Sequence, residues 1–137
     1  MYLLDTNALS EPLKRRPSPA FLERLEAARC RKKFTSVICL MEMRYGCGRR
    51  ADGGKLWKRI SESLLPLVEV LPVDSTVAAQ AGDLMAFARG KGRPRSTEDI
   101  LIAATALVHG LTLITHDRHD FGDLPPLKVE DWMTASS

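Results

Sequence analysis

The chain begins Met1-Tyr2-Leu3-Leu4-Asp5-Thr6-Asn7, and the rest of the expected fold is organised around this stretch. Tyr2 to Leu4 is typical of a short buried strand, which makes Asp5 the first residue beyond it. In an open parallel α/β sheet, ligands bind outside the carboxyl ends of the strands, so a carboxylate there is a candidate functional group. The alternative is that Asp5 and Asn7 only cap or turn the chain. This stretch alone favours neither.

The bulk properties indicate one globular domain. The chain has 137 residues, of which 45% are hydrophobic and 27% charged, and its net charge is +3. We expect a single domain over residues 1–133 and a flexible tail over 134–137. The first residues lack the length and basic start of a signal peptide, and no apolar run approaches membrane-spanning length. Three cysteines without CxxC spacing give no zinc or redox motif. We therefore expect a cytoplasmic protein that makes no membrane contact.

Hydrophobic patterns predict strands alternating with helices. The predicted strands are 2–4, 33–35, 68–73, 111–115 and 127–129. The predicted helices are 8–13, 19 to about 28, 37 to about 46 or 48, 55–65, about 75–88 and 99–109. Gly53 and Gly54 are expected to separate two helices, and Gly110 to stop the most apolar one. This alternation favours an α/β fold with a mostly parallel sheet covered on both faces.

Three further acids stand out, and each has an ordinary structural explanation. Glu42 lies in an apolar-rich helix, where it would need a compensating partner, and an arginine such as Arg44 or Arg95 would satisfy it. Asp99 lies in a first helical turn, where Ser96-x-x-Asp99 resembles a capping box. Asp117 follows a strand, as Asp5 does, and loop chemistry would account for it. Asp120, close to Asp117, is a weaker candidate for a functional acid because it lies further into the turn.

Together the acids favour a metal-dependent site. Strand ends and the first turns of following helices share one edge of a parallel sheet, which brings Asp5, Asp99 and Asp117 together, with Glu42 reaching in from its helix. Clustered carboxylates repel one another unless they are protonated or bound to cations. Oxygen-only donor sets favour Mg²⁺ or Mn²⁺. His116 and His119 flank Asp117 without a third ligand at zinc spacing, so we expect both at the surface.

Basic residues suggest a polyanionic partner. They gather in short clusters at 14–16, 29–33, 49–50 and 89–95. Arg93 and Arg95, just before Asp99, are candidate RNA contacts. Few aromatic residues interleave with these clusters, so a platform for stacking bases is not indicated.

In order along the chain, these motifs resemble those of PIN-domain nucleases. The matching segments are Leu3 to Asn7, the helix from Ser36 to Gly46 with Glu42, Asp99-Ile100-Leu101-Ile102-Ala103-Ala104-Thr105-Ala106, and Leu113 to Asp117. The Ser10-Glu11-Pro12 continuation is similar to VapC-like toxins of type II toxin–antitoxin systems. The resemblance spans residue 2 to about 131.

The resemblance implies a three-layer α/β/α fold with about five strands and Mg²⁺- or Mn²⁺-dependent RNA cleavage. Carried over position by position, it implies catalytic and metal-binding roles for Asp5, Glu42, Asp99 and Asp117. Asp120 is a possible additional acid. It also implies a homodimer and a VapB-like antitoxin whose C-terminal segment covers the active site and often brings an arginine to the acids.

The resemblance further implies that Thr6, Asn7 and Thr115 support the first and last acids. Other functions stay open beside it. A metal-dependent DNA nuclease has the same acid requirement. A phosphatase with an aspartyl nucleophile would want an aspartate where Asn7 stands. A catalytically silent partner of a DNA-binding antitoxin would not need all four acids.

Overall fold

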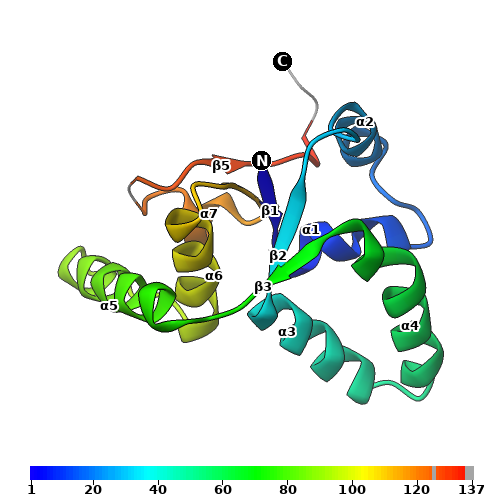
Figure 1. Cartoon of the computed structure of the whole chain (residues 1–137), viewed down its shortest axis with the longest axis horizontal. Helices are drawn as coiled ribbons and strands as arrows, with labels where there is room; N and C mark the ends of the chain where they lie inside the picture. Colours follow the sequence, from blue (N-terminus) through cyan, green and yellow to red (C-terminus); the bar gives the residue numbers. More distant parts are fainter. Residues whose placement is uncertain (125, 135–137) are drawn as a thin grey trace.

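The computed structural model describes residues 1–124 and 126–134, and five strands in it form one parallel sheet (Figure 1). The strands are β1 Tyr2–Leu4, β2 Lys33–Ser36, β3 Glu69–Leu71, β4 Thr112–Ile114 and β5 Val129–Glu130. Their order is β3-β2-β1-β4-β5, and every pair is parallel. The chain steps from β1 out to β3 and then returns to the other side of β1. The carboxyl ends of β1 and β4 therefore flank the crevice where such sheets bind ligands.

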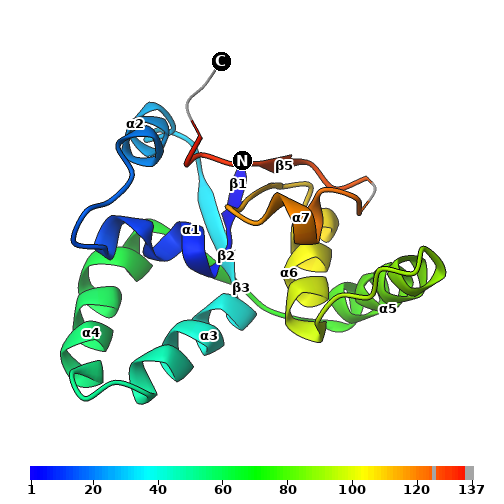
Figure 2. The same cartoon turned by 180° about the vertical axis from the view of Figure 1, so that it is seen from behind.

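Helices cover both faces of the sheet, which confirms the predicted three layers. The α-helices are α1 Thr6–Ser10, α2 Pro19–Ala27, α3 Val37–Gly48, α4 Gly53–Arg59, α5 Ser75–Gly90, α6 Thr97–Val108 and α7 Arg118–Phe121. Two 3₁₀ segments, η1 Glu11–Leu13 and η3 Leu65–Leu67, and one π-helical segment, η2 Ile60–Leu64, complete the described elements. Figures 1 and 2 show α5, α6 and α7 on one side, α1, α2 and α4 on the other, and α3 beyond the strand ends.

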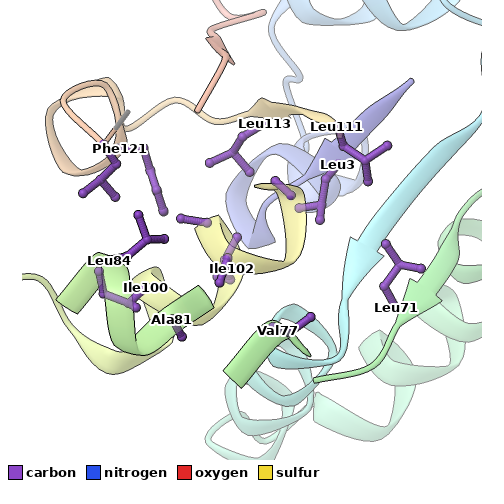
Figure 3. Close-up of a cluster of buried hydrophobic side chains, with 14 of the residues drawn as sticks. Leu3, Leu71, Val77, Ala81, Leu84, Ile100, Ile102, Leu111, Leu113 and Phe121 are labelled. Carbon is purple, nitrogen blue, oxygen red and sulfur yellow. The ribbon is translucent and has the colours of Figure 1, made fainter. Parts of the chain in front are cut away.

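Alternation along the central strands builds two cores. Leu3 and Leu113 point into a cluster with α5 and α6, whereas Leu4 and Ile114 point into one with α1 and α2. Successive strand residues face opposite sides of a sheet, so three-residue strands serve both layers. Figure 3 shows the first cluster, in which β1 and β4 side chains meet those of the two helices. Cys39 packs there as a buried free thiol, as its apolar surroundings predict, and burial raises its pKa to about 11.

Several element bounds differ from the prediction. The first helix begins at Thr6 rather than residue 8, because the Asp5 side chain caps it. Gly53 and Gly54 are the first residues of α4 instead of a separator. A Cβ on Gly53 would lie 1.8 Å from the Cys47 carbonyl oxygen, so this close turn requires glycine. The helix predicted over 55–65 continues as the π-helical segment η2.

The end of the chain differs too. A short helix, α7, replaces the polar turn expected after β4, and β5 lies one to two residues later than predicted. Gly110 has φ +64° just beyond α6, which confirms it as a helix stop. Of the predicted tail, residues 135–137 lie outside the described residues. In the described part of the chain, no helix has the length and apolar character needed to cross a membrane.

Candidate active site

Asp5 is buried at the end of the central strand and serves two structures at once. Its Oδ1 accepts a hydrogen bond from the backbone N–H of Ala8 at 2.8 Å, which caps α1. Its Oδ2 accepts one from Oγ1 of Thr115, the residue that follows β4. Burial raises the pKa of Asp5 to about 6, and the charges of Asp99 and Glu42 add to that rise. Asp5 is thus both the cap and an acid placed among other acids.

Glu42 extends from α3 toward the first turn of α1. Thr6 donates a hydrogen bond from Oγ1 to Oε1 of Glu42 at 2.6 Å. Neither arginine suggested as its partner pairs with it. Arg44 lies over the ring of Trp57, with its guanidinium carbon 4.7 Å from the ring centre, and Arg95 pairs elsewhere. Glu42 is therefore oriented by a neutral hydroxyl rather than by an arginine.

Asp99 lies half-buried in the first turn of α6. Its backbone N–H donates to Oγ of Ser96 at 3.1 Å, so the expected cap is present. Burial raises the pKa of Asp99 above its ordinary value, and the charges of Glu42 and Asp117 contribute further. The Ser96 side chain also interacts with the Asp99 carboxyl and lowers its pKa, which partly offsets that rise.

Asp117 and Asp120 flank the start of α7. Asp117 is exposed, and its Oδ1 accepts a hydrogen bond from the backbone N–H of Asp120 at 3.2 Å. The backbone N–H of Asp117 donates to Oγ1 of Thr115 at 2.9 Å. Hydrogen bonding with the Asp117 carboxylate is the main cause that raises the pKa of Asp120, followed by burial. Asp120 consequently lies beside the last acid of the predicted set.

The supporting residues act differently from the prediction. Thr6 supports Glu42 rather than the first acid, because α1 turns its side chain toward α3. Thr115 supports both the first and the last acid through one hydroxyl. Asn7 is exposed, and among the described residues its side chain forms no hydrogen bond. A further residue that the sequence did not single out is Thr35, whose Oγ1 donates to the Leu4 carbonyl at 2.8 Å and secures the end of β1.

Arg95, one of the two predicted RNA contacts, has its guanidinium engaged within the protein. Its side chain is only 5% exposed and pairs with Asp123, so it is part of the fold. Arg93 is 41% exposed but is also paired with Asp123, at 2.6 Å. The two histidines are exposed, as expected. His116 lies 3.4 Å from a carboxylate oxygen of Asp131.

The donor set at this edge consists of carboxylate oxygens without basic partners. In the part of the chain that the structure describes, none of the five acids forms an ion pair with lysine or arginine. Over the same residues, no three acidic, histidine or cysteine side chains converge closely enough to hold an ion by themselves. Magnesium is usually held by one or two carboxylates with water completing its shell, so the chemistry of these donors fits Mg²⁺ or Mn²⁺.

Comparison with known proteins places the chain in a family. The model of the PIN domain matches residues 2–125. The chain belongs to the PIN domain family. It is 36% identical to the toxin FitB of Neisseria gonorrhoeae, over 88% of this chain and 91% of that protein. It is 30% identical to a tRNA(fMet)-specific endonuclease VapC of Salmonella typhimurium, over 96% and 97% of the two chains.

The fold of this PIN domain matches a solved relative over nearly its whole length. A chain in the crystal structure of DNA-bound VapBC from Salmonella typhimurium superposes with a TM-score of 0.85 at 29% identity. The match covers 96% of this chain and 97% of the other. The resemblance to PIN-domain nucleases drawn from the sequence motifs is thereby confirmed for the family and the fold.

Proposed function

We propose that this PIN domain is the toxin of a type II toxin–antitoxin system and cleaves RNA phosphodiester bonds with Mg²⁺ or Mn²⁺. One observation carries the proposal: β1, α3, α6 and the segment after β4 bring acids to one edge of the sheet, and none of these acids forms an ion pair with lysine or arginine within residues 1–124 and 126–134. Burial and the neighbouring acids raise the pKa of Asp5 to about 6, so the site disfavours a negative charge that no cation compensates. RNA is favoured as the substrate by similarity to the VapC endonuclease of Salmonella typhimurium, whose name specifies a transfer RNA.

The proposed metal ligands are drawn from Asp5, Glu42, Asp99 and Asp117, with Asp120 as an additional acid. One or two of these carboxylates would bind the ion directly, with water completing its shell. When bound, the ion would stabilise negative charge that develops at the reacting phosphodiester. The chain's own part is to orient the carboxylates. The Thr115 hydroxyl orients the Asp5 carboxylate, whose other oxygen accepts the Ala8 N–H, and the Thr6 hydroxyl orients Glu42 through one carboxylate oxygen.

Cleavage assays with the purified protein test this proposal. RNA should be cut in the presence of Mg²⁺ or Mn²⁺ and left intact with a chelator. Asp5→Asn should abolish cleavage. The matched control is Asp74→Asn, because Asp74 caps α5 through a 2.9 Å contact from the Val77 N–H, as Asp5 caps α1, but lies outside the acid cluster. Full activity in Asp5→Asn, or in the chelated parent, would contradict the proposed site.

The same assay separates the alternative functions. Single-stranded and duplex DNA of matched sequence should not be cut, and a phosphomonoester should not be hydrolysed. In cells, expression of the parent should arrest growth, and Asp99→Asn should relieve the arrest. Arrest that persists in Asp99→Asn would favour a binding protein over an enzyme.

We also propose an antitoxin partner that covers the acids. Support comes from the unpaired carboxylates themselves, because a cationic side chain placed among them would relieve their repulsion. The similar chain from Salmonella typhimurium was solved as part of DNA-bound VapBC. The test is to co-purify the chain with the product of a neighbouring small reading frame. Loss of inhibition after changing an arginine in the partner's C-terminal segment is the expected result.

A homodimer is our further proposal for the assembly. Val37, Met41 and Tyr45 are exposed at four-residue spacing on α3, so they lie on one face of that helix. Exposed apolar stripes of this kind commonly mark association surfaces. Light scattering of the purified protein should give about twice the monomer mass, and Met41→Glu should lower it. A monomeric parent would contradict the proposal.

A further inference from the structure

Two arginines hold the short helix that follows the last acid-bearing segment. Arg95 donates from Nε to the Asp120 carbonyl at 2.7 Å and pairs through Nη2 with one carboxylate oxygen of Asp123. Arg93 pairs with the other oxygen of Asp123 at 2.6 Å and donates from Nη2 to the His119 carbonyl at 3.0 Å. Asp123 thus bridges two guanidinium groups, and both arginines bind the backbone of the α7 segment.

This segment needs such support, because a helix of four residues does not form by itself. On its inner side, Phe121 is buried in the core with α5 and α6. On its outer side, the polar contacts described above come from Arg93 and Arg95. Figures 1 and 2 show α7 beside α6, and the residues of the two helices are in contact.

The arginine contacts lie between Asp99 in α6 and Asp117 at the start of α7. Arg95 directly precedes Ser96, which caps the helix that carries Asp99. At the other end of the link, Asp120 is held to Asp117 by its N–H. A change in the arginine contacts would therefore shift Asp117 relative to Asp99.

We propose that Arg95, paired with Asp123, is a positioning residue that fixes Asp117 and Asp120 relative to Asp99. The inference rests on the proposed metal-dependent nuclease and adds to it the device that sets the spacing of its acids. Arg95 does not reach RNA in this arrangement, because its side chain is buried and its guanidinium is engaged in the protein. Arg95 affects cleavage by setting the positions of Asp117 and Asp120.

Asp123→Asn is the first test, because Asp123 is 38% exposed and its replacement removes the ion pairs without leaving a buried cavity. The matched control is Glu62→Gln. Glu62 forms an exposed ion pair with Lys58 at 4.0 Å. It belongs to η2, which continues α4, and Figure 1 shows α4 on the opposite side of the sheet from α7. Both variants change the net charge by the same amount, so a general effect of charge on RNA binding would appear in both.

In steady-state assays with an RNA oligonucleotide and Mn²⁺, we expect Asp123→Asn to lower kcat about tenfold and to leave KM within about twofold. The Mn²⁺ concentration for half-maximal rate should rise about tenfold as well. Glu62→Gln should match the parent. If the arginines contacted RNA instead, releasing them from Asp123 would lower KM with kcat unchanged, and that result would overturn the proposal.

Amide hydrogen exchange supplies a readout that needs neither metal nor RNA. The backbone N–H of Asp120 should exchange at least about tenfold faster in Asp123→Asn, because its acceptor on Asp117 is no longer held, while amides of α6 keep their protection. Unchanged exchange at Asp120 would overturn the proposal. A parent that cleaves no RNA would count against the proposed function, whereas this measurement would still decide whether Asp123 holds Asp117.

Arg95→Lys is a second variant that keeps the charge but lacks the planar set of donors. It should reproduce the lower kcat and the higher Mn²⁺ requirement of Asp123→Asn. Asp123→Glu, which retains a carboxylate, should restore most of the activity. Parental kcat and Mn²⁺ dependence in Arg95→Lys would overturn the role assigned to the guanidinium.

Discussion

Thr115 donates a hydrogen bond from Oγ1 to Oδ2 of Asp5 across 110 positions of sequence. Oγ1 of Thr115 also accepts a hydrogen bond from the backbone N–H of Asp117 at 2.9 Å. The contact exists because β1 and β4 are neighbours in register, with Leu4 opposite Ile114. The Thr115 hydroxyl therefore links the first and last acids of the site. Thr115 directly follows β4, which pairs with β1 in the middle of the sheet.

Thr115→Val should impair catalysis more than folding. Valine fills the same space but removes the donor to Asp5, and because that hydrogen bond lowers the pKa of Asp5, its loss should raise the pKa beyond about 6. Cleavage should fall about ten- to a hundredfold, and the acidic limb of the pH–rate profile should move to higher pH. Thr115→Ser retains the hydroxyl and serves as the control. An acidic limb at the same pH in Thr115→Val and Thr115→Ser would refute this role.

Asp5→Asn should stabilise the metal-free protein at neutral pH while it abolishes activity. The pKa of Asp5 rises from 3.8 to about 6 on folding, so the folded state binds more protons than the unfolded state between these values. Stability contributed by this group is therefore lost as the pH rises from about 4 to 6, and the penalty is complete at pH 7 and above.

Removing that penalty should increase the free energy of unfolding by about 1–3 kcal/mol at pH 7.5. The gain should disappear near pH 4, where Asp5 is protonated in the folded parent. Urea unfolding at both pH values measures the difference, with chelator present throughout. Asp74→Asn should show no comparable gain. If Asp5→Asn is less stable than the parent at pH 7.5, the carboxylate is not destabilised by its surroundings.

Metal should stabilise the parent and have a smaller effect on the acid variants. An ion that binds only the folded state at a hundred times its Kd adds about 2.7 kcal/mol, which corresponds to a rise in Tm of about 5–10 °C for a chain of this size. Thermal melts with millimolar Mn²⁺ should show this rise, and chelator should reverse it. Asp5→Asn and Asp99→Asn should each lose most of it. If neither Mn²⁺ nor Mg²⁺ changes the Tm of the parent, that result would argue against a metal site.

RNA affinity should decrease steeply with salt. Lysine and arginine clusters such as 14–16 are exposed, and neutralising phosphates with them releases counterions from the RNA. A plot of log affinity against log salt concentration should be linear, and Arg15→Gln combined with Arg16→Gln should reduce the magnitude of its slope by about 1.4 if both contact single-stranded RNA. The assay should use the inactive Asp99→Asn protein to prevent cleavage. A flat plot would exclude a mainly electrostatic interface.

Local patterns in the sequence predicted most elements because capping and hydrophobic spacing act over a few residues. Ser96 caps α6 as expected, Ser36 caps α3, and Gly110 stops α6. The predictions failed where a distant contact sets the local structure. The four residues of α7 look like a polar turn in sequence, because the arginines that hold them lie more than 20 residues earlier.

The opening stretch shows how this limit affects the site. The sequence offers Asp5 either as a cap or turn residue or as a functional acid, and in the structure it caps α1 through Ala8 and is nearly fully buried. Its two alternatives were not exclusive, because one oxygen caps the helix and the other meets Thr115.

The sequence by itself determined the alternation of strands and helices, the order of the four acids, and the placement of Asp5, Asp99 and Asp117 near strand ends or a helix start. Only the tertiary structure decided which side chains meet: Thr115 with Asp5, Thr6 with Glu42, and Arg95 with Asp123. The physical reason is the strand order. Local propensity forms each strand, but pairing β1 with β4 depends on burying both faces of the whole sheet at once, and that pairing brings residues 5 and 115 together.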